Sequence, residues 1–386
     1  MITDNINLVV FTREYPVGMA GTKRIRNFLD FLTRYNIKIN VISFRSQIRQ
    51  PKPDVLNNHI PYVNIGAGIE MKLAQIHRII NYYFRGIRTI LKLRKKNYSN
   101  IVYNAGGINI ENFLFLLFAR ITGYKLVLAI EEDYTSFKDD IKPLSKFKCW
   151  TIRRFDSLNC RWASAIIVIS RFLMNKYLEM RAGKIFLIPI TAQVNFNESK
   201  KTFNSPLRII YAGTFADKDG VNDIIEGFLK FSGFYSNAEL ILTGQSSQQV
   251  NYLKKYGDEK NISFRGFVDD DEFYSLLRDA DVLCMCRDNS EFANAGFPFK
   301  LGEYLATGNP VICTRVSDVE YYLDENDAFL IDPGNPQQIS DSLARIVNDP
   351  KAARKMGYNG LEKCRRFFSI EGNGSQLYDI LRSISK

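Results

Sequence analysis

Short apolar runs alternate along the chain with longer segments in which apolar residues recur at helical spacing. In the first half the apolar runs are INLVVFT, INVISF, IVYN, KLVLAI, AIIVIS and IFLIPI, with helices expected from Thr22 and from about Met71. Strands that are apolar throughout and separated by helices are typical of a parallel sheet covered on both faces. The pattern predicts a doubly wound α/β domain.

The alternation stops at residues 191–206, where TAQVNFNESKKTFNSP is polar and rich in loop-forming residues. It restarts with LRIIYAG, and AELILTG, ISFRG, DVLCMC, NPVICT and AFLIDP follow with helical segments between them. The sequence therefore predicts an α/β protein with two Rossmann-like doubly wound parallel-sheet domains facing a central cleft. The expected boundaries are 1–190, a linker at 191–206, 207–365, and a C-terminal helix at 366–386 that can cross back to the first domain.

Composition and the lengths of the apolar runs argue against export and against a membrane span. Hydrophobic residues make up 46% of the 386 residues and charged residues 24%, as in globular proteins. The N-terminal run LVVF is too short for the core of a signal peptide. FLFLLFA at 113–119 falls well short of the roughly 20 residues that cross a bilayer. We expect a cytoplasmic protein.

Cysteine usage fits a reducing compartment. The six cysteines are scattered, and Cys284 and Cys286 in VLCMC would point to opposite faces of a strand, which suits neither a disulfide nor a shared metal. We expect reduced and buried thiols. No cluster of Asp and His ligands is evident either, so no obligatory metal is predicted.

Charge divides the chain into two unlike halves. Residues 1–190 hold 30 Lys and Arg against 13 Asp and Glu, a net charge of +17, and the remainder holds 22 against 28, a net charge of −6. Residues 72–98, KLAQIHRIINYYFRGIRTILKLRKKNY, contain eight basic residues and no acidic one, with apolar residues at helical spacing. This segment predicts a basic amphipathic helix that lies on an anionic membrane surface. A solvated helix packed on the sheet explains the same pattern.

Loops that follow strands are the candidate sites, because open α/β sheets bind ligands beyond the carboxyl ends of their strands. In YAGTFADKDGVNDIIEGF, Gly213 ends a strand, Lys218 lies in a short loop, and a helix begins at Val221. A glycine, a lysine and a helix N-terminus together suit a phosphate group. An ordinary turn with a solvated lysine is the alternative.

The first strand is followed by a similar loop, FTREYPVGMAGTKRIRNF. Here Gly18 and Gly21 precede Lys23 and Arg24, which open a helix and are also candidates to face a phosphate. A plain turn accounts for this loop equally well.

A single carboxylate stands out in GFPFKLGEYLATGNPVICT. The spacing predicts a helix from about Phe299 to Ala306, with Gly308 as its C-terminal cap and Leu301, Tyr304 and Leu305 facing inward. Glu303 falls on the adjacent face, where a carboxylate complements the helix dipole.

These motifs together resemble a known family. YAGTFADKDGVNDIIEGF, LILTG, FRGFV, ADVLCMCR and FPFKLGEYLATGNPVI resemble, in order and spacing, the family 4 retaining glycosyltransferases of GT-B fold, the glycosyl transferases group 1 type. The resemblance covers residues 207–345 and extends more loosely to REYPVGMAGTKRI and SAIIVISRFLMNKY.

The resemblance implies a donor site for a nucleotide-sugar such as a UDP- or GDP-sugar, with no obligatory cofactor. Glu303 would bind the ribose hydroxyls, Lys218 and Lys300 the diphosphate, and the backbone of Phe267 and Val268 the base edge. Residues 294–297 would line the sugar pocket. The expected donor-binding residues are Gly21, Gly213, Thr214, Lys218, Gly244, Phe267, Val268, Asn294, Gly296, Phe297, Lys300, Leu301 and Glu303.

The chain departs from the family pattern at three places. Ala295 stands where the family has a second glutamate, which touches the donor sugar, and Thr214 stands where arginine is frequent. The first-domain histidine of the family is replaced by EED, from Glu131 to Asp133. Glu131 and Glu132 are therefore the acceptor-side candidates, with a solvated acidic loop as the alternative.

The expected function is transfer of a sugar, with retention of configuration, to a hydroxyl of a glycan or lipid-linked acceptor in bacterial surface polysaccharide or glycolipid synthesis. In such a hexosyltransferase-like enzyme Lys218, Glu131 and Glu132 are the expected catalytic residues, and the protein is peripheral on the inner face of the membrane. A sugar-nucleotide epimerase of GT-B fold and a non-catalytic nucleotide-sugar-binding partner protein are the alternatives. No nucleic-acid-binding motif is present, so nucleic acid is not an expected partner. The sequence gives no oligomeric state.

Overall fold

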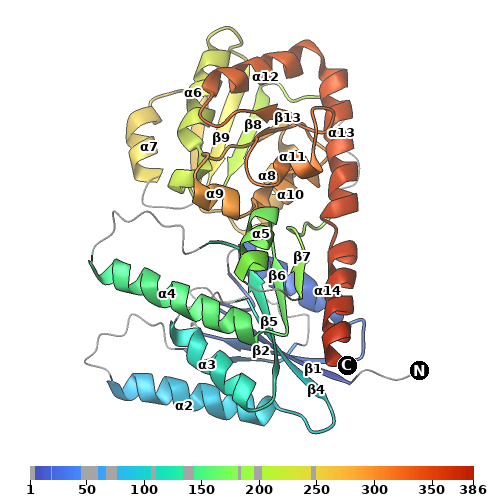
Figure 1. Cartoon of the computed structure of the whole chain (residues 1–386). Coiled ribbons are helices and arrows are strands. Elements are labelled where there is room, and N and C mark those ends of the chain that lie inside the picture. Colours follow the sequence, from blue (N-terminus) through green and yellow to red (C-terminus); the bar gives the residue numbers. More distant parts are fainter. Residues whose placement is uncertain are drawn as a thin grey trace. The chain divides into compact units, whose positions relative to one another are not determined.

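The computed structural model describes residues 5–18, 20–44, 60–66, 76–105, 110–133, 143–180, 184–194, 202–244 and 249–386. These residues form two compact units. The first unit is Met1–Pro189 together with Ile370–Lys386, and the second is Ile190–Ser369. Each unit contains one sheet, as the alternating pattern predicts (Figure 1).

The first unit is built on a parallel sheet of seven strands. In spatial order the strands are β3 (Tyr62–Asn64), β2 (Ile37–Ser43), β1 (Ile6–Thr12), β4 (Ser99–Asn104), β5 (Lys125–Ile130), β6 (Ala165–Val168) and β7 (Ile185–Leu187). Every residue of the central strand β1 is buried, since helices cover both faces of the sheet. The sequence order reverses beside β1, where β4 pairs with it in parallel.

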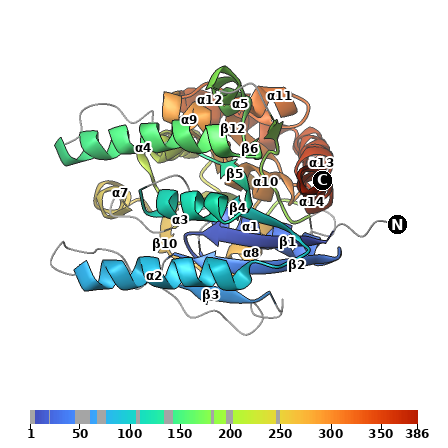
Figure 2. The ribbon, with the colours of Figure 1, turned by 60° about the horizontal axis from the view of Figure 1, so that its bottom comes forward.

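Six helices flank this sheet. They are α1 (Ala20–Leu32), α2 (Ile76–Leu93), α3 (Ile110–Ile121), α4 (Pro143–Trp162), α5 (Arg171–Met180) and the C-terminal α14 (Ile370–Ser385). Helices α2, α3 and α4 lie side by side (Figure 2). Helix α14 packs against α1, where Leu377 and Leu381 share a core with Phe28 and Leu32.

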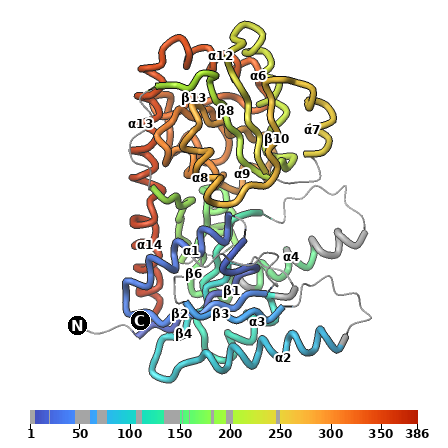
Figure 3. Tube along the Cα trace, turned by 180° about the vertical axis from the view of Figure 1, so that it is seen from behind, coloured from blue at the N-terminus to red at the C-terminus, as the bar shows by residue number. Residues whose placement is uncertain are grey.

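The second unit contains a parallel sheet of six strands. Their spatial order is β10 (Ile262–Gly266), β9 (Ala238–Thr243), β8 (Leu207–Ala212), β11 (Val282–Met285), β12 (Val311–Thr314) and β13 (Phe329–Ile331). The 3-10 turn η3 (Asp217–Asp219) leads into α6 (Val221–Ser232), and the chain continues through α7 (Gln249–Tyr256), α8 (Asp270–Asp279), α9 (Glu291–Ala295), α10 (Phe299–Leu305), α11 (Val319–Tyr322), α12 (Pro336–Asn348) and α13 (Pro350–Phe367) (Figure 3). The fold class predicted from the sequence, two Rossmann-like parallel-sheet bodies, is confirmed.

Several boundaries differ from the predicted ones. The basic helix ends at Leu93 rather than at residue 98, and its predicted residues 72–75 lie outside the described residues. The second unit begins at Ile190 and ends at Ser369 rather than spanning 207–365, because Ile190 and Ala192 lie beside Gly302 of α10 and α13 packs against α10 and α12. Residues 195–201 of the predicted linker lie outside the described residues.

The described cysteines are free and buried. Cys160, Cys284, Cys286, Cys313 and Cys364 form no disulfide, and burial raises the pKa of the Cys284, Cys313 and Cys364 thiols to about 12. The prediction of reduced, buried thiols is confirmed for these five, while the side chain of Cys149 lies outside the described set. Among the described helices, none has the length and apolar character that crossing a membrane requires.

Candidate functional site

Two glycines bring the ends of three strands together in the second unit. Gly213 follows β8 and donates its N–H to Thr243 O at the end of β9 at 2.9 Å. Gly244 follows β9, has a φ of +140°, and donates to Gly266 O at 2.7 Å. A β-carbon on Gly244 would lie 1.5 Å from Gly213 O, so no other residue fits there. The predicted site glycines Gly213 and Gly244 therefore meet at the carboxyl edge of the sheet.

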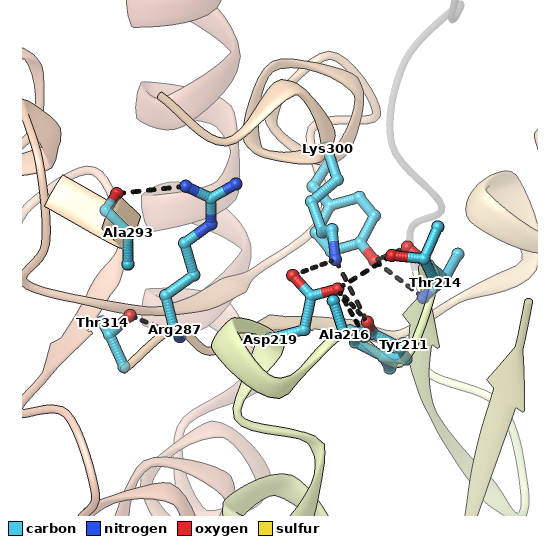
Figure 4. A network of polar contacts seen from close by, with 10 residues as sticks. Tyr211, Thr214, Ala216, Asp219, Arg287, Ala293, Lys300 and Thr314 are labelled. Carbon is cyan, nitrogen blue, oxygen red and sulfur yellow. Dashed lines mark hydrogen bonds and ion pairs between the residues drawn. The ribbon is translucent and has the colours of Figure 1, made fainter. Parts of the chain in front are cut away.

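Lys300, the second residue of α10, places its ammonium group at the end of β8. Its Nζ lies 3.2 Å from Asp219 Oδ1 and donates to the Tyr211 hydroxyl at 3.1 Å (Figure 4). The same Nζ sits 4.6 Å from the centroid of the Tyr211 ring. A β-carbon added to Gly213 would lie 2.4 Å from Lys300 Nζ, so the glycine leaves room for the cation.

Asp219, the last residue of η3, anchors this network. Its Oδ2 accepts hydrogen bonds from the Tyr211 hydroxyl at 3.1 Å, from Thr214 Oγ1 at 3.3 Å and from Ala216 N at 3.4 Å (Figure 4). The carboxylate is thereby held by donors from β8 and from the loop that follows it. Sequence reasoning missed Asp219 and Tyr211, because nothing in ADKDG separates the exposed Asp217 from the buried Asp219.

The pKa values of Asp219 and Lys300 depend on both burial and neighbouring charges. Burial alone would raise the pKa of the Asp219 carboxyl, but the Lys300 ammonium and the Arg287 guanidinium outweigh it and hold that pKa below its ordinary value. Burial lowers the pKa of Lys300, and Asp219 opposes that shift, while Arg287 and Lys218 add to it.

Arg287 is a further buried cation of this region that the sequence analysis did not single out. It follows β11, its side chain donates from Nη1 to Ala293 O at 3.2 Å, and its backbone N–H donates to Thr314 Oγ1 at 2.9 Å. It was missed because an arginine after a strand end has no distinctive spacing.

Lys218, the lysine singled out in the sequence, has different surroundings from Lys300. It lies in η3, and its Nζ is 4.3 Å from the centroid of the Phe292 ring of α9. Its carbonyl accepts from Asp288 N at 3.1 Å. Lys218 is thus a partly buried cation over an aromatic ring, whereas Lys300 lies directly at the end of β8.

Helix α10 forms as predicted and carries Glu303. Leu301, Tyr304 and Leu305 are fully buried, which confirms the predicted inward face. The Tyr304 hydroxyl accepts from Ala212 N at 2.8 Å and donates to Ala212 O at 3.1 Å, which ties α10 to the end of β8. Glu303 is half-buried on the adjacent face, one residue from this anchor.

Residues before α10 are used mainly in packing and capping. Asn294 in α9 accepts from Ser317 N at 2.8 Å and donates to Asn289 Oδ1 at 2.8 Å. The Phe297 ring packs against Tyr322 and Phe368 in the core. The buried side chains of Phe297 and Leu301 therefore act in packing.

The residues predicted to read a base lie after β10. Phe267 is 50% exposed and Val268 is half-buried, and both follow Gly266, whose φ is +65°. The turn therefore presents an aromatic side chain to solvent next to the ends of β9 and β10.

The first unit has its own cluster at a strand end. Glu131 follows β5, and its Oε1 accepts from Arg24 Nη1 at 2.8 Å. Arg24 Nη2 donates to Ile188 O at 2.7 Å and to Pro189 O at 3.0 Å. Both terminal nitrogens of Arg24 thus bind protein oxygens, which argues against the phosphate role considered for it from the sequence. Gly21 lies beside the pair, where a β-carbon would be 3.1 Å from Glu131 Oε2.

The rest of the acidic run divides between surface and core. Glu132 is half-buried, whereas Asp133 is buried and pairs with Lys176 Nζ at 2.7 Å. Among the described residues, no group of three or more His, Cys, Asp or Glu could hold a metal ion.

Comparison with known proteins identifies relatives of the second unit. Residues 194–363 match the family model described as glycosyl transferases group 1. An uncharacterized glycosyltransferase of Methanocaldococcus jannaschii is 24% identical over 205 residues, 52% of this chain and 55% of that protein. The chain thus spans about half the length of this relative. An alpha-D-kanosaminyltransferase of Streptomyces kanamyceticus is 19% identical over 323 residues, which are 77% of this chain and 81% of that protein.

Solved structures share the fold over nearly the whole chain. Anabaena HepE in complex with UDP and glucose superposes with a TM-score of 0.74 at 15% identity, covering 98% of this chain and 100% of that chain. A sucrose-phosphate synthase of Thermosynechococcus elongatus gives a TM-score of 0.74 at 15% identity, covering 98% and 99%.

Proposed function

We propose that this protein, whose residues 194–363 match the glycosyl transferases group 1 model, transfers a sugar from a nucleoside diphosphate to a hydroxyl group. The second unit binds the donor and the first unit the acceptor. The observation that carries the proposal is the buried Lys300 ammonium beside Gly213, at the sheet edge where open α/β folds bind their ligands.

The donor occupies the loops after β8 to β11 in this proposal. Glu303 accepts hydrogen bonds from the ribose hydroxyls, Lys300 and Lys218 bind the diphosphate, and the turn at 267–268 contacts the base. HepE binds UDP, which makes UDP-sugars the first donors to test. Position 295 is a fully buried alanine, which has no carboxylate to offer to the donor sugar.

Transfer retains configuration and produces a glycan or glycolipid of the cell surface. The bond between the anomeric carbon and the phosphate oxygen breaks, a new bond to the acceptor oxygen forms on the same face, and the acceptor proton passes to the leaving diphosphate. Cations stabilise the charge that develops on the diphosphate. Glu131 and Glu132 orient the acceptor hydroxyl.

A thermal-shift panel of UDP-, GDP-, ADP- and CDP-sugars tests the donor assignment. Binding to the folded state adds about 2.7 kcal/mol at a ligand concentration of 100 times Kd. Glu303→Ala should abolish the rise in Tm that the wild type shows. Glu259→Ala, which removes an exposed carboxylate of the same unit, is the control and should respond as the wild type does. An unchanged response of Glu303→Ala would refute the ribose assignment.

Acceptor dependence separates a transferase from the alternatives. A glycosyltransferase releases its nucleoside diphosphate at a rate that rises with acceptor concentration, because transfer and release are one event. An epimerase of the same fold changes the sugar without an acceptor, and a binding protein releases nothing. Retention is read from the anomeric coupling constant of the product by NMR.

We further propose that helix α2 docks the first unit on an anionic membrane, near a lipid-linked acceptor. The described helix carries no acidic residue. Ile80, Phe84 and Leu91 are 62%, 60% and 50% exposed, and they fall within one stripe of the helix. Exposed Arg88 lies beside that stripe, and exposed Arg85, which donates to Asn64 O, lies further round the helix on the same side. An apolar stripe with cations on one side of it suits a bilayer with anionic headgroups.

Flotation with vesicles tests this docking. The wild type should float with vesicles that contain phosphatidylglycerol and stay behind with pure phosphatidylcholine. Arg85→Glu with Arg88→Glu should abolish flotation, whereas Lys254→Glu with Lys351→Glu, the same charge change on exposed sites of the second unit, should leave it intact. Equal loss in both double variants would mean that net charge alone governs binding.

A further inference from the structure

A buried network of two hydrogen bonds and one ion pair connects three elements of the second unit. It joins Lys300 from α10, Tyr211 from β8 and Asp219 from η3, and its members are close enough to fix one another (Figure 4). The Tyr211 hydroxyl accepts from Lys300 and donates to Asp219, so its hydrogen-bonding capacity is used in one defined direction. A long lysine side chain is thereby held in a single conformation.

The two charged members are exposed to different extents. The Asp219 side chain is 4% exposed and that of Lys300 is 15% exposed. The carboxylate is therefore the inner member, enclosed by donors from Tyr211, Thr214 and Ala216, and the ammonium is the outer member, next to Gly213. A ligand that reaches the end of β8 meets the cation first.

The charge balance of the cluster favours an anion. The cations Arg287 and Lys218 lower the pKa of Lys300 and the carboxylate of Asp219 raises it, so the four groups comprise three cations and one anion. Without Asp219 the ammonium would be buried near two like charges, and both burial and repulsion favour its neutral form. With Asp219 the ammonium stays charged and keeps its place, and the cluster still carries an excess of positive charge.

We propose that Asp219 is a positioning residue that, together with Tyr211, holds the Lys300 ammonium against the diphosphate of the donor. The inference rests on the proposed function and deepens it, because it assigns the main diphosphate cation to Lys300 rather than to Lys218. Lys218, whose ammonium lies over the Phe292 ring, contributes to the surrounding charge. Asp219 itself touches no substrate.

Calorimetric titration with UDP, GDP, ADP and CDP tests the role of Lys300, with the matching nucleosides as phosphate-free controls. A hydrogen bond to a charged group contributes about 1.5–3 kcal/mol. Lys300→Met should therefore weaken binding of the diphosphate that the wild type prefers by roughly 10- to 100-fold. Its affinity for the nucleoside should not change. Lys218→Met should weaken diphosphate binding less.

The pH dependence of binding tests the role of Asp219. Removing its charge should lower the pKa of Lys300 further, so as the pH is raised from about 7 to about 10 the Asp219→Asn variant should lose diphosphate affinity at a lower pH than the wild type does. Arginine remains charged in this range. The double variant Asp219→Asn with Lys300→Arg should therefore bind with a flat pH profile.

Each outcome decides one point. If Asp219→Asn binds as the wild type does at every pH, or loses affinity equally at every pH, Asp219 is only a structural ion-pair partner and the inference is wrong. Tyr211→Phe, which removes one hydroxyl, should show the same pH trend to a smaller extent and serves if Asp219→Asn does not fold. A wild type that binds none of the diphosphates refutes the proposed donor site, whereas binding that Lys300→Met leaves intact refutes this inference alone.

Discussion

Two buried ion pairs at strand ends, Arg24 with Glu131 in the first unit and Lys300 with Asp219 in the second, are built in opposite senses. In the first unit the cation is inside: the Arg24 side chain is 2% exposed and that of Glu131 is 19% exposed. In the second unit the anion is inside, since Asp219 is 4% exposed and Lys300 is 15% exposed. The first pair therefore presents a carboxylate outward and the second presents an ammonium.

This difference matches the partners proposed for the two units. An exposed carboxylate oxygen accepts a hydrogen bond from a hydroxyl group, which is what an acceptor sugar or lipid offers. An exposed ammonium binds a phosphate oxygen through a charge-assisted hydrogen bond. The inner partner in each case is fixed by further contacts: Arg24 by two backbone carbonyls, and Asp219 by three donors.

The largest expected effect comes from removing the inner cation of the first unit. Arg24→Met leaves Glu131 without its partner and two carbonyls without a donor, so the free energy of unfolding should fall by about 3–5 kcal/mol. Urea unfolding followed by tryptophan fluorescence measures it, because Trp150 and Trp162 both lie in α4 of the first unit. Arg34→Met, at an arginine that is 59% exposed, is the control and should cost less than about 0.5 kcal/mol. Equal losses would show that Arg24 is not the structural centre of its pair.

Removing the outer cation of the second unit should lower the rate of transfer and leave the stability of the first unit unchanged. Lys300→Met takes away a group that stabilises the developing diphosphate charge, and kcat/KM for the donor should fall about 100-fold or more. Urea unfolding of the first unit, read from the same tryptophans, should not change. A loss of less than tenfold would remove Lys300 from the transfer step.

Removing the outer anion should have an intermediate effect on the acceptor. Glu131→Gln keeps the shape of the side chain but weakens its hydrogen bond to a hydroxyl, so KM for the acceptor should rise about tenfold, which corresponds to about 1.4 kcal/mol. Binding of UDP, measured by calorimetry, should be unaffected. A change in UDP affinity with no change in acceptor KM would reverse the assignment of roles to the two units.

The smallest expected effect is on stability in acid. The pKa of Asp219 is held below its ordinary value of 3.8, so its stabilising contribution is present above that value and is lost as the pH falls through the lower pKa of the folded state. Amide hydrogen exchange of peptides covering β8 should therefore accelerate on the acid side of 3.8 in the wild type. Asp219→Asn, which cannot titrate, should show no such dependence, and an identical acid response in both would exclude Asp219 as its source.

Much of the fold follows from local patterns in the sequence. The apolar runs predict the long strands of both sheets, and the spacing of Leu301, Tyr304 and Leu305 predicts α10 and its buried face. Gly213 and Gly244 were also identified, since glycine after a strand end is a local signal. The 3-residue strand β3 was missed because Tyr62 and Val63 are exposed and lack the apolar pattern of a central strand.

The candidate site was predicted less completely, because its members are distant in the chain. Lys218 and Glu303 were chosen for their motif, and the assignment of both stays a prediction. Asp219 lies one residue from Lys218, yet only its approach to Lys300 from α10 and to Tyr211 from β8 distinguishes it. Arg24 was considered for a phosphate on account of its loop, and its contacts with Glu131 and Ile188 show instead that it belongs to an internal pair.

The sequence alone determined the fold class, the position of the apolar strands, the charge asymmetry of the halves and the family resemblance, because each of these is encoded in neighbouring residues or in periodic spacing. Only the tertiary structure decided which charged groups pair and which member of each pair is exposed. The burial of each charged group and its distance to a partner decide this, and the partners are far apart in the chain. Lys300 and Tyr211 are separated by 89 positions, and Arg24 and Glu131 by 107.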